Sequence, residues 1–432
     1  MVRILIIILF SSASLFAQEE INLEQSIKKT LLNNYSIKLV NQQVKIAENN
    51  SGAGNAGMLP VLNANAGYTE STQNSELEFA GGIPNQSNRN ARTNNFNANL
   101  QLSWTIFDGL AMFSNYDKLE KLKTISQIAL QIEMENTIRS LTQTYINALT
   151  ANSRLRNLRQ SLELSRTRLD RVRESQKFGN ASNLQVLQAQ VDLNTDSIAC
   201  LESELQYQSL VNTMKFIMGE KTDRKYVLLD DIKIDQELDF VDLKDNTFRL
   251  NNSINQALLN KEVSQEDYNI AIAAFMPQVS VNASYGYSRN ESEAGFLLLN
   301  ESWGPNVGAN LNWNLFNSFR KNTALQNSKV AIESQEIAIQ NIKASIELNL
   351  INNWQTYIKR KEILNLTELS VEAAEDNYER TLENFKYGNS NSIELRQAQV
   401  NLINTKIALD QAKYNLKLAE TELKIISGNL LN

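Results

Sequence analysis

The sequence contains no histidine and only one cysteine, Cys200, among its 432 residues. Histidine is the commonest general base at neutral pH and the commonest transition-metal ligand, so its absence argues against acid–base catalysis and a dedicated metal site. One cysteine cannot form a disulfide within the chain, and at a helical position it indicates a small buried side chain. The G-x-S-x-G, P-loop and paired-cysteine motifs are absent too. We therefore expect a protein that is not an enzyme and has no cofactor.

Long hydrophobic runs and an excess of positive charge are also missing. No run of 18 or more apolar residues follows residue 17, which argues against a transmembrane helix. The net charge of −6 argues against nucleic acid as a partner. Residues 1–17 contain one basic residue, a short apolar core and small residues before Ala17, which is typical of a secretory signal peptide cleaved before Gln18. A buried N-terminal helix is the alternative interpretation.

Two stretches of the sequence are nearly the same, KFGNASNLQVLQAQV at 177–191 and KYGNSNSIELRQAQV at 386–400. They are 386 − 177 = 209 positions apart, and the same offset relates the WTIF and WNLF sequences that begin at Trp104 and Trp313. Further upstream, around Pro60 and Pro277, the offset is 277 − 60 = 217. Self-similarity over much of the chain predicts a tandem duplication.

Proline and glycine are scarce, and their positions divide each half. All four prolines lie within 58–107 or 275–316. Gly179 is the only glycine between 110 and 218, and Gly388 is the only one between 309 and 427. Because both residue types break helices, each half should contain two long helical arms that meet at one glycine. The apolar 3,4 spacing after residue 400 is typical of a coiled coil, although an ordinary long helical bundle remains the alternative.

The segments that carry the prolines alternate between apolar and small polar residues. Each run has about ten residues, the length that a tilted transmembrane strand needs. Trp104, Trp313 and Tyr287 near the strand ends suit an aromatic girdle at a membrane interface. A soluble sheet packed on helices is the alternative. Four strands cannot close a barrel in a bilayer, so we expect an oligomer. The predicted strands are 61–69, 96–106, 279–288 and 307–315.

With helix, two strands and a long helical hairpin repeated in this order, the sequence resembles the TolC-like outer-membrane efflux family over about residues 22–428. The resemblance implies a mostly α fold with membrane β: tandem-duplicated long helical hairpins forming an α-barrel tunnel, plus four strands per chain in a trimeric 12-stranded β-barrel. It also implies the domain plan of signal peptide 1–17, first repeat 18–218, equatorial linker 219–247, second repeat 248–428 and tail 429–432.

The implied function is an exit duct in the cell outer membrane that extends into the periplasm. It would be a passive, water-filled channel of a tripartite efflux pump or a type I secretion system, opened by adaptor docking. The implied partners are two further copies in a homotrimer, a periplasmic adaptor (membrane fusion) protein, an inner-membrane transporter and outer-membrane lipid. The alternative from another class is a secreted periplasmic coiled-coil adaptor or structural protein without a pore.

The resemblance places the repeated stretch at the periplasmic entrance of the tunnel. Glycine suits a turn that needs positive φ, and Ser182 and Ser392 are the expected N-caps of the returning helices. The hairpin tips that would contact the adaptor are Lys177, Phe178, Gly179, Asn180, Lys386, Tyr387, Gly388 and Asn389.

The same resemblance assigns the pore entrance to Glu394, Gln397 and Gln185. Relatives carry carboxylates six and nine positions after the second tip glycine. Here those positions hold Glu394 and Gln397, so one negative ring per trimer would remain. The Arg–Asp pair that closes the entrance in relatives is replaced by Ser390 and Gln185. Closure would therefore need other contacts, for which the candidates are Lys177, Lys386, Glu394 and Arg396.

Overall fold

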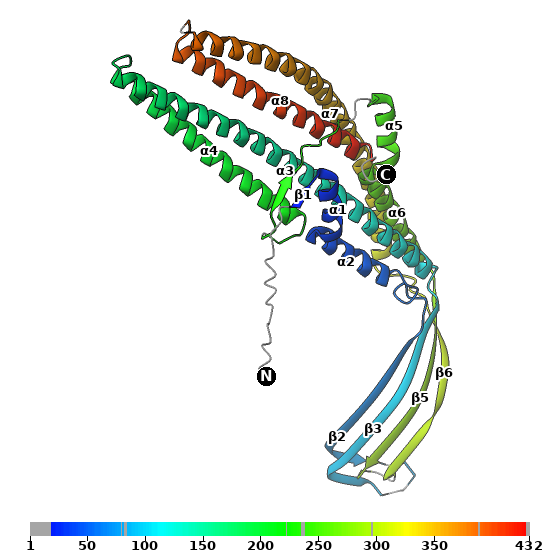
Figure 1. Ribbon diagram of the computed structural model, residues 1–432. Coiled ribbons are helices and arrows are strands. Elements are labelled where there is room, and N and C mark those ends of the chain that lie inside the picture. Colours follow the sequence, from blue (N-terminus) through cyan, green and yellow to red (C-terminus); the bar gives the residue numbers. More distant parts are fainter. Residues whose placement is uncertain are drawn as a thin grey trace, which may run out of the picture. The chain divides into compact units, whose positions relative to one another are not determined.

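The computed structural model describes residues 19–78, 80–81, 84–221, 223–234, 238–294, 297–387 and 389–428 (Figure 1). The expected signal peptide and the expected tail lie outside the described residues. The helices are α1 (Leu23–Asn33), α2 (Tyr35–Asn50), α3 (Ala111–Lys177), α4 (Asn183–Ile217), α5 (Phe240–Leu250), α6 (Asn252–Ala273), α7 (Arg320–Lys386) and α8 (Ser392–Ile426). The strands are β1 (Glu19–Ile21), β2 (Val61–Leu77), β3 (Gln86–Phe107), β4 (Tyr226–Leu228), β5 (Gln278–Ser292) and β6 (Leu299–Asn312).

The long helical arms confirm the duplicated, mostly α fold. Helices α3 and α7 have 67 residues each, and α4 and α8 have 35 each. Their first residues differ by 320 − 111 = 209 and 392 − 183 = 209. Helices α1 and α5 have 11 residues each and begin 240 − 23 = 217 positions apart. Both offsets seen in the sequence therefore reappear in the helix boundaries.

Contacts divide the chain into two compact units that do not follow the two halves of the sequence. Unit 1 comprises Met1–Gln42, Ala129–Asn255 and Asn341–Asn432, and unit 2 comprises Gln43–Ile128 and Gln256–Gln340. Each unit thus takes segments from both halves. Within the described residues, no helix combines the length and the apolar character needed to cross a bilayer.

Unit 1 has two hydrophobic clusters, one for each helical hairpin. In the first, Leu141 and Tyr145 of α3 pack against Met214 of α4 and Tyr414 of α8. The single hydroxyl proton of Tyr145 is shared between the backbone oxygens of Leu229 (2.8 Å) and Ile21 (3.0 Å), which ties the short parallel pair β1–β4 to this cluster. The second cluster joins α7, α8 and α5 through Leu350, Tyr357, Leu416, Leu423 and Leu243. Helix α8 therefore contributes to both clusters.

An asparagine follows α1 and α5 and makes the same two contacts in each copy. The Asn34 Nδ2 donates to the Ile217 oxygen at the end of α4 (2.7 Å), and its Oδ1 accepts from the Ile37 N–H (3.1 Å). The Asn251 Nδ2 likewise donates to the oxygen of Ile426 at the end of α8 (3.0 Å). Each asparagine satisfies a carbonyl that the helix end leaves without an intrahelical partner.

The predicted equatorial linker, 219–247, contains regular structure. Strand β4 lies within 219–247, and α5 begins there, at Phe240. Asp239 is the N-cap of α5, because its carboxylate accepts the backbone N–H groups of Val241 (2.7 Å) and Asp242 (3.1 Å). The first helix of the second copy therefore starts before the boundary predicted at 247.

Unit 2 contains an antiparallel sheet in the order β2-β3-β5-β6. Its strands have 17, 22, 15 and 14 residues, so the expectation of about ten residues each was too short. The alternating pattern stops before the strands end, because segments 70–76 and 86–95 carry polar residues on both faces, with Ala91 as the one apolar residue among them. Strand β6 also ends at Asn312, so Trp313 follows the strand instead of lying within it.

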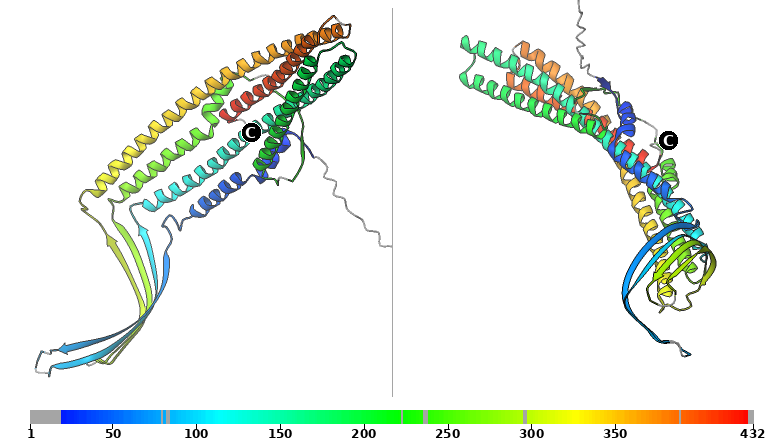
Figure 2. Two further views of the ribbon diagram at one scale, coloured as in Figure 1. Left: turned by 90° about the vertical axis from the view of Figure 1, so that its left-hand side faces the viewer. Right: turned by 90° about the horizontal axis from the view of Figure 1, so that it is seen from below.

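The two β-hairpins of the sheet differ in length. Pairing between β3 and β5 stops at Thr93 and Ser292, whereas β2 and β3 stay paired as far as Leu77 and Gln86. Figure 2 (left) shows this β2–β3 extension as the blue hairpin. The eight extra residues of the first half, 217 − 209, fall in this extension and its turn.

Candidate functional site

The first hairpin tip is built by one glycine and one serine. Gly179 ends α3 with φ +75°. Its N–H donates to the Gln176 oxygen (3.0 Å), and the Asn180 N–H reaches back to the Ser175 oxygen (2.9 Å), as in a Schellman turn. Ser182 then starts α4, which confirms the expected N-cap.

The second tip follows the same plan with one correction. The Asn389 N–H donates to the Asn384 oxygen (2.8 Å), as Asn180 does in the first tip, while Gly388 itself lies outside the described residues. The N-cap of α8 is Asn391, so the assignment of Ser392 was wrong. The Asn391 Oδ1 accepts the N–H groups of Ile393 (3.0 Å) and Glu394 (2.9 Å), and the residue aligns with Ser182, since 182 + 209 = 391.

Gln185 and Glu394, predicted at the pore entrance, close the capping boxes of these two helices. The Gln185 Oε1 accepts the Ser182 N–H (2.8 Å). The Glu394 carboxylate accepts from the Ser390 hydroxyl (2.6 Å) and from the Asn391 N–H (3.1 Å). The Ser390 hydrogen bond, and then that of Asn391, holds the pKa of Glu394 below its ordinary value. Glu394 therefore remains ionised at neutral pH, and its role at a pore stays a prediction.

Each tip exposes two large apolar side chains at equivalent positions. Phe178 is 78% exposed and Tyr387 is 81% exposed, and 178 + 209 = 387. Leu184 and Ile393 follow in the same way, in the first turn of the returning helices. Large exposed apolar side chains that recur at equivalent positions mark a surface that a partner can cover. Among the other predicted tip and entrance residues, Lys177 pairs with Glu174 (2.6 Å) and Gln397 donates to Asn401 (2.9 Å).

A buried polar cluster joins the two hairpins and was not predicted. The Arg396 guanidinium of α8 pairs with Asp196 of α4 (2.7 Å) and donates to Ser161 (3.2 Å) and Ser165 (3.4 Å) of α3. The Gln399 Nε2 also donates to Ser161 (3.2 Å). Burial alone would raise the pKa of Asp196, but the hydrogen bonds from Arg396 and Ser165 outweigh it and lower that pKa. The available sequence signal was two serines, four positions apart, on the buried face of α3.

The three predicted interface aromatics do not lie in one row of the sheet, where a row is a set of residues paired with one another across neighbouring strands. The indole N–H of Trp104 donates to the Met58 oxygen (2.9 Å), and that of Trp313 donates to the Phe275 oxygen (3.0 Å). These two bonds are equivalent under the duplication, since 104 + 209 = 313 and 58 + 217 = 275. Trp104 pairs with Val281, six residues along β5 from Tyr287, which is about 20 Å. Tyr287 instead shares a row with Trp303, which was not predicted.

Along the central part of the sheet, one face is apolar and the other is polar. Cross-strand partners lie on the same face, so the register assigns each row. The apolar rows include Leu62, Leu102, Ala283 and Val307; Ala64, Leu100, Tyr285 and Pro305; and Ala66, Ala98, Tyr287 and Trp303. The rows between them are Asn63, Gln101, Ser284 and Asn306; Asn65, Asn99, Gly286 and Gly304; and Gly67, Asn97, Ser288 and Ser302.

The apolar face has the height of a bilayer core. It runs along β5 from Val279 to Arg289, where Arg289 pairs with Glu301 of β6 (3.2 Å) and charged side chains begin. Ten residues extend about 33 Å, and at the usual strand tilt of about 40° this covers about 25 Å of membrane thickness.

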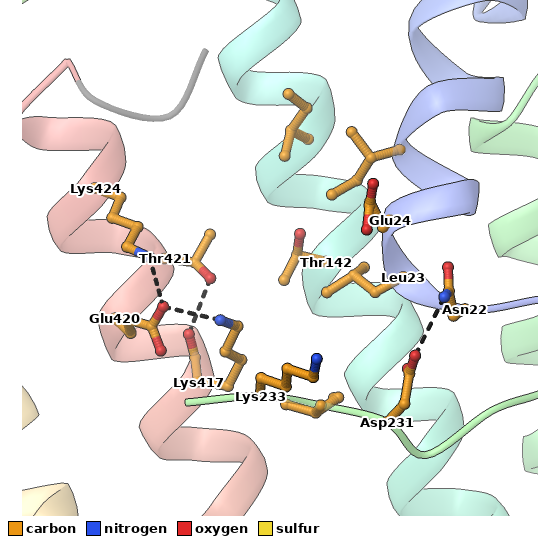
Figure 3. A pocket seen from close by; sticks show the side chains of 13 residues that line it. Asn22, Leu23, Glu24, Thr142, Asp231, Lys233, Lys417, Glu420, Thr421 and Lys424 are labelled. Atoms are coloured by element: carbon orange, nitrogen blue, oxygen red, sulfur yellow. Dashed lines mark hydrogen bonds and ion pairs between the residues drawn. The ribbon is translucent and has the colours of Figure 1, made fainter. Parts of the chain in front are cut away.

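Unit 1 also has a cavity of about 500 Å³ between α1, α3, α8 and the segment after β4 (Figure 3). Glu420, with a relative exposure of 0%, accepts from Lys417 (2.8 Å) and Lys424 (2.9 Å) on its wall. Asn22 donates to Asp231 on the opposite side (3.1 Å). Three lysines and three carboxylates line this cavity, so its charge favours neither an anion nor a cation.

Comparison with known proteins bears on both the hairpins and the sheet. The sequence profile described as outer membrane efflux protein matches residues 26–220 and 245–429. The chain belongs to the outer membrane efflux protein family. This TolC-like family consists of channels for efflux, and it is not a family of enzymes.

Similar proteins cover nearly the whole of this efflux protein. It is 21% identical to outer membrane protein TolC of Escherichia coli (strain K12), over 99% of this chain and 86% of that protein. Its fold is similar to that of the CmeC outer membrane channel of Campylobacter jejuni, with a TM-score of 0.77, 16% identity and coverage of 94% and 85%. The outer membrane protein VceC of Vibrio cholerae gives a TM-score of 0.74, 16% identity and coverage of 94% and 96%.

Proposed function

We propose that three copies of this efflux protein form a passive exit duct of the outer membrane that extends into the periplasm. The duct serves a tripartite efflux pump or a type I secretion system, and a periplasmic adaptor opens it by docking at the hairpin tips. The observation that carries the proposal is that, among the described residues, both edges of the sheet have no paired strand and the outer helices α4 and α7 each leave one apolar face exposed.

The sheet edges support assembly. Strands β2 and β6 each pair with one strand of the described sheet, and the apolar face beside them has the height of a bilayer core. Unpaired backbone groups are too costly to leave in lipid, so β6 of one copy is expected to pair with β2 of the next. Three copies close the sheet with twelve strands, whereas one copy has half the minimum of about eight.

The outer helices support the same head-to-tail contact. Helices α4 and α7 each carry exposed apolar residues within one narrow face, at coiled-coil spacing. On α4 these are Leu184, Leu187, Val191, Ile198, Leu201 and Leu205, and on the unit 1 part of α7 they are Leu348, Ile351, Ile358, Leu366 and Leu369. A cyclic trimer needs a heterologous interface, in which two different surfaces of the same chain meet in neighbouring copies. The exposed faces of α4 and α7 would provide such a pair of surfaces.

The polar sheet face explains why the duct is passive. Asn, Ser and Thr side chains and glycine residues line this face, and they are compatible with water while offering few groups that would hold one cargo tightly. Transport would then be diffusion, with the energy supplied by the inner-membrane transporter. The tips with Phe178 and Tyr387 are the proposed adaptor surface, because they combine exposed apolar side chains with a duplicated geometry.

Disulfide trapping between copies tests the assembly. Leu201 lies 201 − 179 = 22 positions after the first tip glycine, and Leu366 lies 388 − 366 = 22 positions before the second. We expect Leu201→Cys with Leu366→Cys, in a Cys200→Ser background, to give a covalent trimer on oxidation, while each single change gives none. The trimer should conduct ions in planar bilayers and copurify with an adaptor. A water-soluble monomer without conductance would instead support the structural coiled-coil alternative.

A further inference from the structure

A second cavity of unit 1, of about 210 Å³, lies between the two helical hairpins near their tips. Helix α3 contributes its wall from Leu164 to Ser175, α7 contributes Leu382 and Phe385, and α8 contributes Leu395. The cavity continues into a shallower groove along α3, which ends beside the exposed ring of Phe178. Side chains from both halves of the duplication therefore enclose one space.

The charged residues on its wall all have the same sign. Three arginines, Arg168, Arg171 and Arg396, line the cavity, and no carboxylate does. Asp192 pairs with Arg168, and Asp196 pairs with Arg396, from outside the lining. Arg171 has no ion pair among the described residues, while Asp170 and Glu174 line the shallower groove into which the cavity continues.

Arg168 contributes a buried N–H donor that has no hydrogen-bond partner among the described residues. Its Nη2 is engaged by Asp192, but its Nε is buried and has no hydrogen-bond partner within the described part of the chain. A buried donor without a partner is costly, and a small side-chain adjustment toward an acceptor in the cavity would recover that cost. Arginine is well suited to a carboxylate or sulfonate because its planar group offers several N–H donors to paired oxygens.

We propose that this cavity binds a small amphipathic monoanion, in which one carboxylate or sulfonate is attached to a compact apolar body. The acid group contacts Arg171 and Arg168, and the apolar body packs among Leu164, Leu382 and Phe385. A cavity of about 150 Å³ holds a benzene ring, so this one has room for a bicyclic aromatic acid. Such a ligand bridges α3 to α7 and α8, and by linkage it stabilises the arrangement of the two hairpins that it touches.

Binding of 2-naphthoate to the full-length trimer in lipid nanodiscs tests the proposal. The neutral 2-naphthamide has the same shape without the charge, and empty nanodiscs report partition into lipid. Saturation-transfer NMR and calorimetry at neutral pH should show naphthoate binding roughly tenfold more tightly than naphthamide, as expected for one charge-assisted hydrogen-bonded contact. Absence of saturable naphthoate binding, or equal affinity for both probes, would overturn the proposal.

Three variants locate the site. Arg171→Gln should weaken naphthoate binding about tenfold and leave naphthamide unchanged. Ser175→Phe fills the cavity and should abolish both, with Val172→Phe as a second filling variant if the first does not assemble. Arg173→Gln, on the same helix but outside the lining, is the matched control and should bind as the wild type does. Wild-type affinity in a filling variant that assembles, or a loss in Arg173→Gln as large as that in Arg171→Gln, would contradict the assignment. Because the site lies within one chain, its failure would leave the channel proposal untouched.

Discussion

Arg396 of α8 forms a 2.7 Å ion pair with Asp196 of α4, and this pair joins the two helical hairpins of one chain. Asp196 is only 6% exposed, so loss of Arg396 leaves a buried carboxylate without its cation. We expect Arg396→Met to destabilise unit 1 by about 3 kcal/mol, measured by thermal unfolding. The control Arg380→Met breaks an exposed pair with Asp376 and should cost less than about 0.5 kcal/mol. Equal effects would show that the buried cluster contributes nothing specific.

The Asp196–Arg396 ion pair should make the stability of the fold depend on pH. The hydrogen bonds of Asp196 lower its pKa in the folded protein although burial opposes them. A lowered pKa stabilises the fold above the unfolded value of about 3.9, and this stability is lost as the pH falls through the folded value. The stability difference between wild type and Asp196→Asn should therefore be constant near neutral pH and shrink below about pH 4. This account would be contradicted if the stability difference between wild type and Asp196→Asn already changed between neutral pH and pH 5, which is roughly one unit above the pH at which we expect it to shrink.

Glu135 should behave in the opposite way. Burial raises the pKa of this carboxyl, and the hydrogen bond from the Asn252 Nδ2 (2.9 Å) only partly opposes it. Because its pKa is raised on folding, the protonated Glu135 carboxyl stabilises the fold at pH values below its pKa in the unfolded chain. This stabilisation is lost as the pH rises through its pKa in the folded protein. Glu135→Gln keeps an acceptor for Asn252 without the buried charge, so we expect a melting temperature higher by about 1–2 °C at neutral pH. No gain, or a loss, would show that the charged form is the favourable one.

Two glycines with positive φ should respond differently to the same substitution. Gly179 has φ +75°, and nothing lies within 4 Å of an added Cβ. Gly179→Ala should therefore cost only the backbone strain, about 1–2 kcal/mol. Gly219 has φ +67°, and an added Cβ would lie 2.4 Å from the Asn33 backbone oxygen. Gly219→Ala must move α1 away from the end of α4, so its melting temperature should fall well below that of Gly179→Ala. Similar melting temperatures would show that this contact gives way easily.

A substitution at Glu394 can separate the effect of its negative charge from the effect of its capping box. Gln at the third helical position can still accept the N-cap N–H, so Glu394→Gln keeps the capping box and removes one negative charge per chain. If the tips surround the pore entrance, the cation preference of the channel should fall, as measured by the reversal potential in a salt gradient. Glu379→Gln, an exposed change on α7, is the control. An unchanged reversal potential in Glu394→Gln would place this carboxylate away from the ion path.

The sequence predicts those features that depend on local chemistry. The scarcity of proline and the lone glycines predicted long helices that meet near positions 179 and 388, and α3 and α7 end two residues before those positions, at Lys177 and Lys386. Alternation identified the central part of each strand. The polar strand ends carry no such pattern and were missed. The Asp196–Arg396 pair depends on how α4 and α8 align across 200 residues of chain, which periodicity within either helix does not determine. The N-cap at Asn391 was missed by one position because Asn and Ser cap helices almost equally well.

The unequal β-hairpins have a consequence for the outer face of the assembled duct. From Thr93 to Gln86, the β2–β3 hairpin extends seven residues, about 23 Å, past the last pair of β3 with β5. In the proposed ring of three copies, the longer β2–β3 hairpins would alternate with the shorter β5–β6 hairpins, so the rim would be threefold symmetric although the duplicated helices approach sixfold symmetry. An antibody or a bacteriophage that approaches the cell from outside would meet the three tall hairpins first. In that arrangement, sequence changes in the extension would alter the outermost surface while leaving the helical tips, the proposed adaptor surface, unchanged.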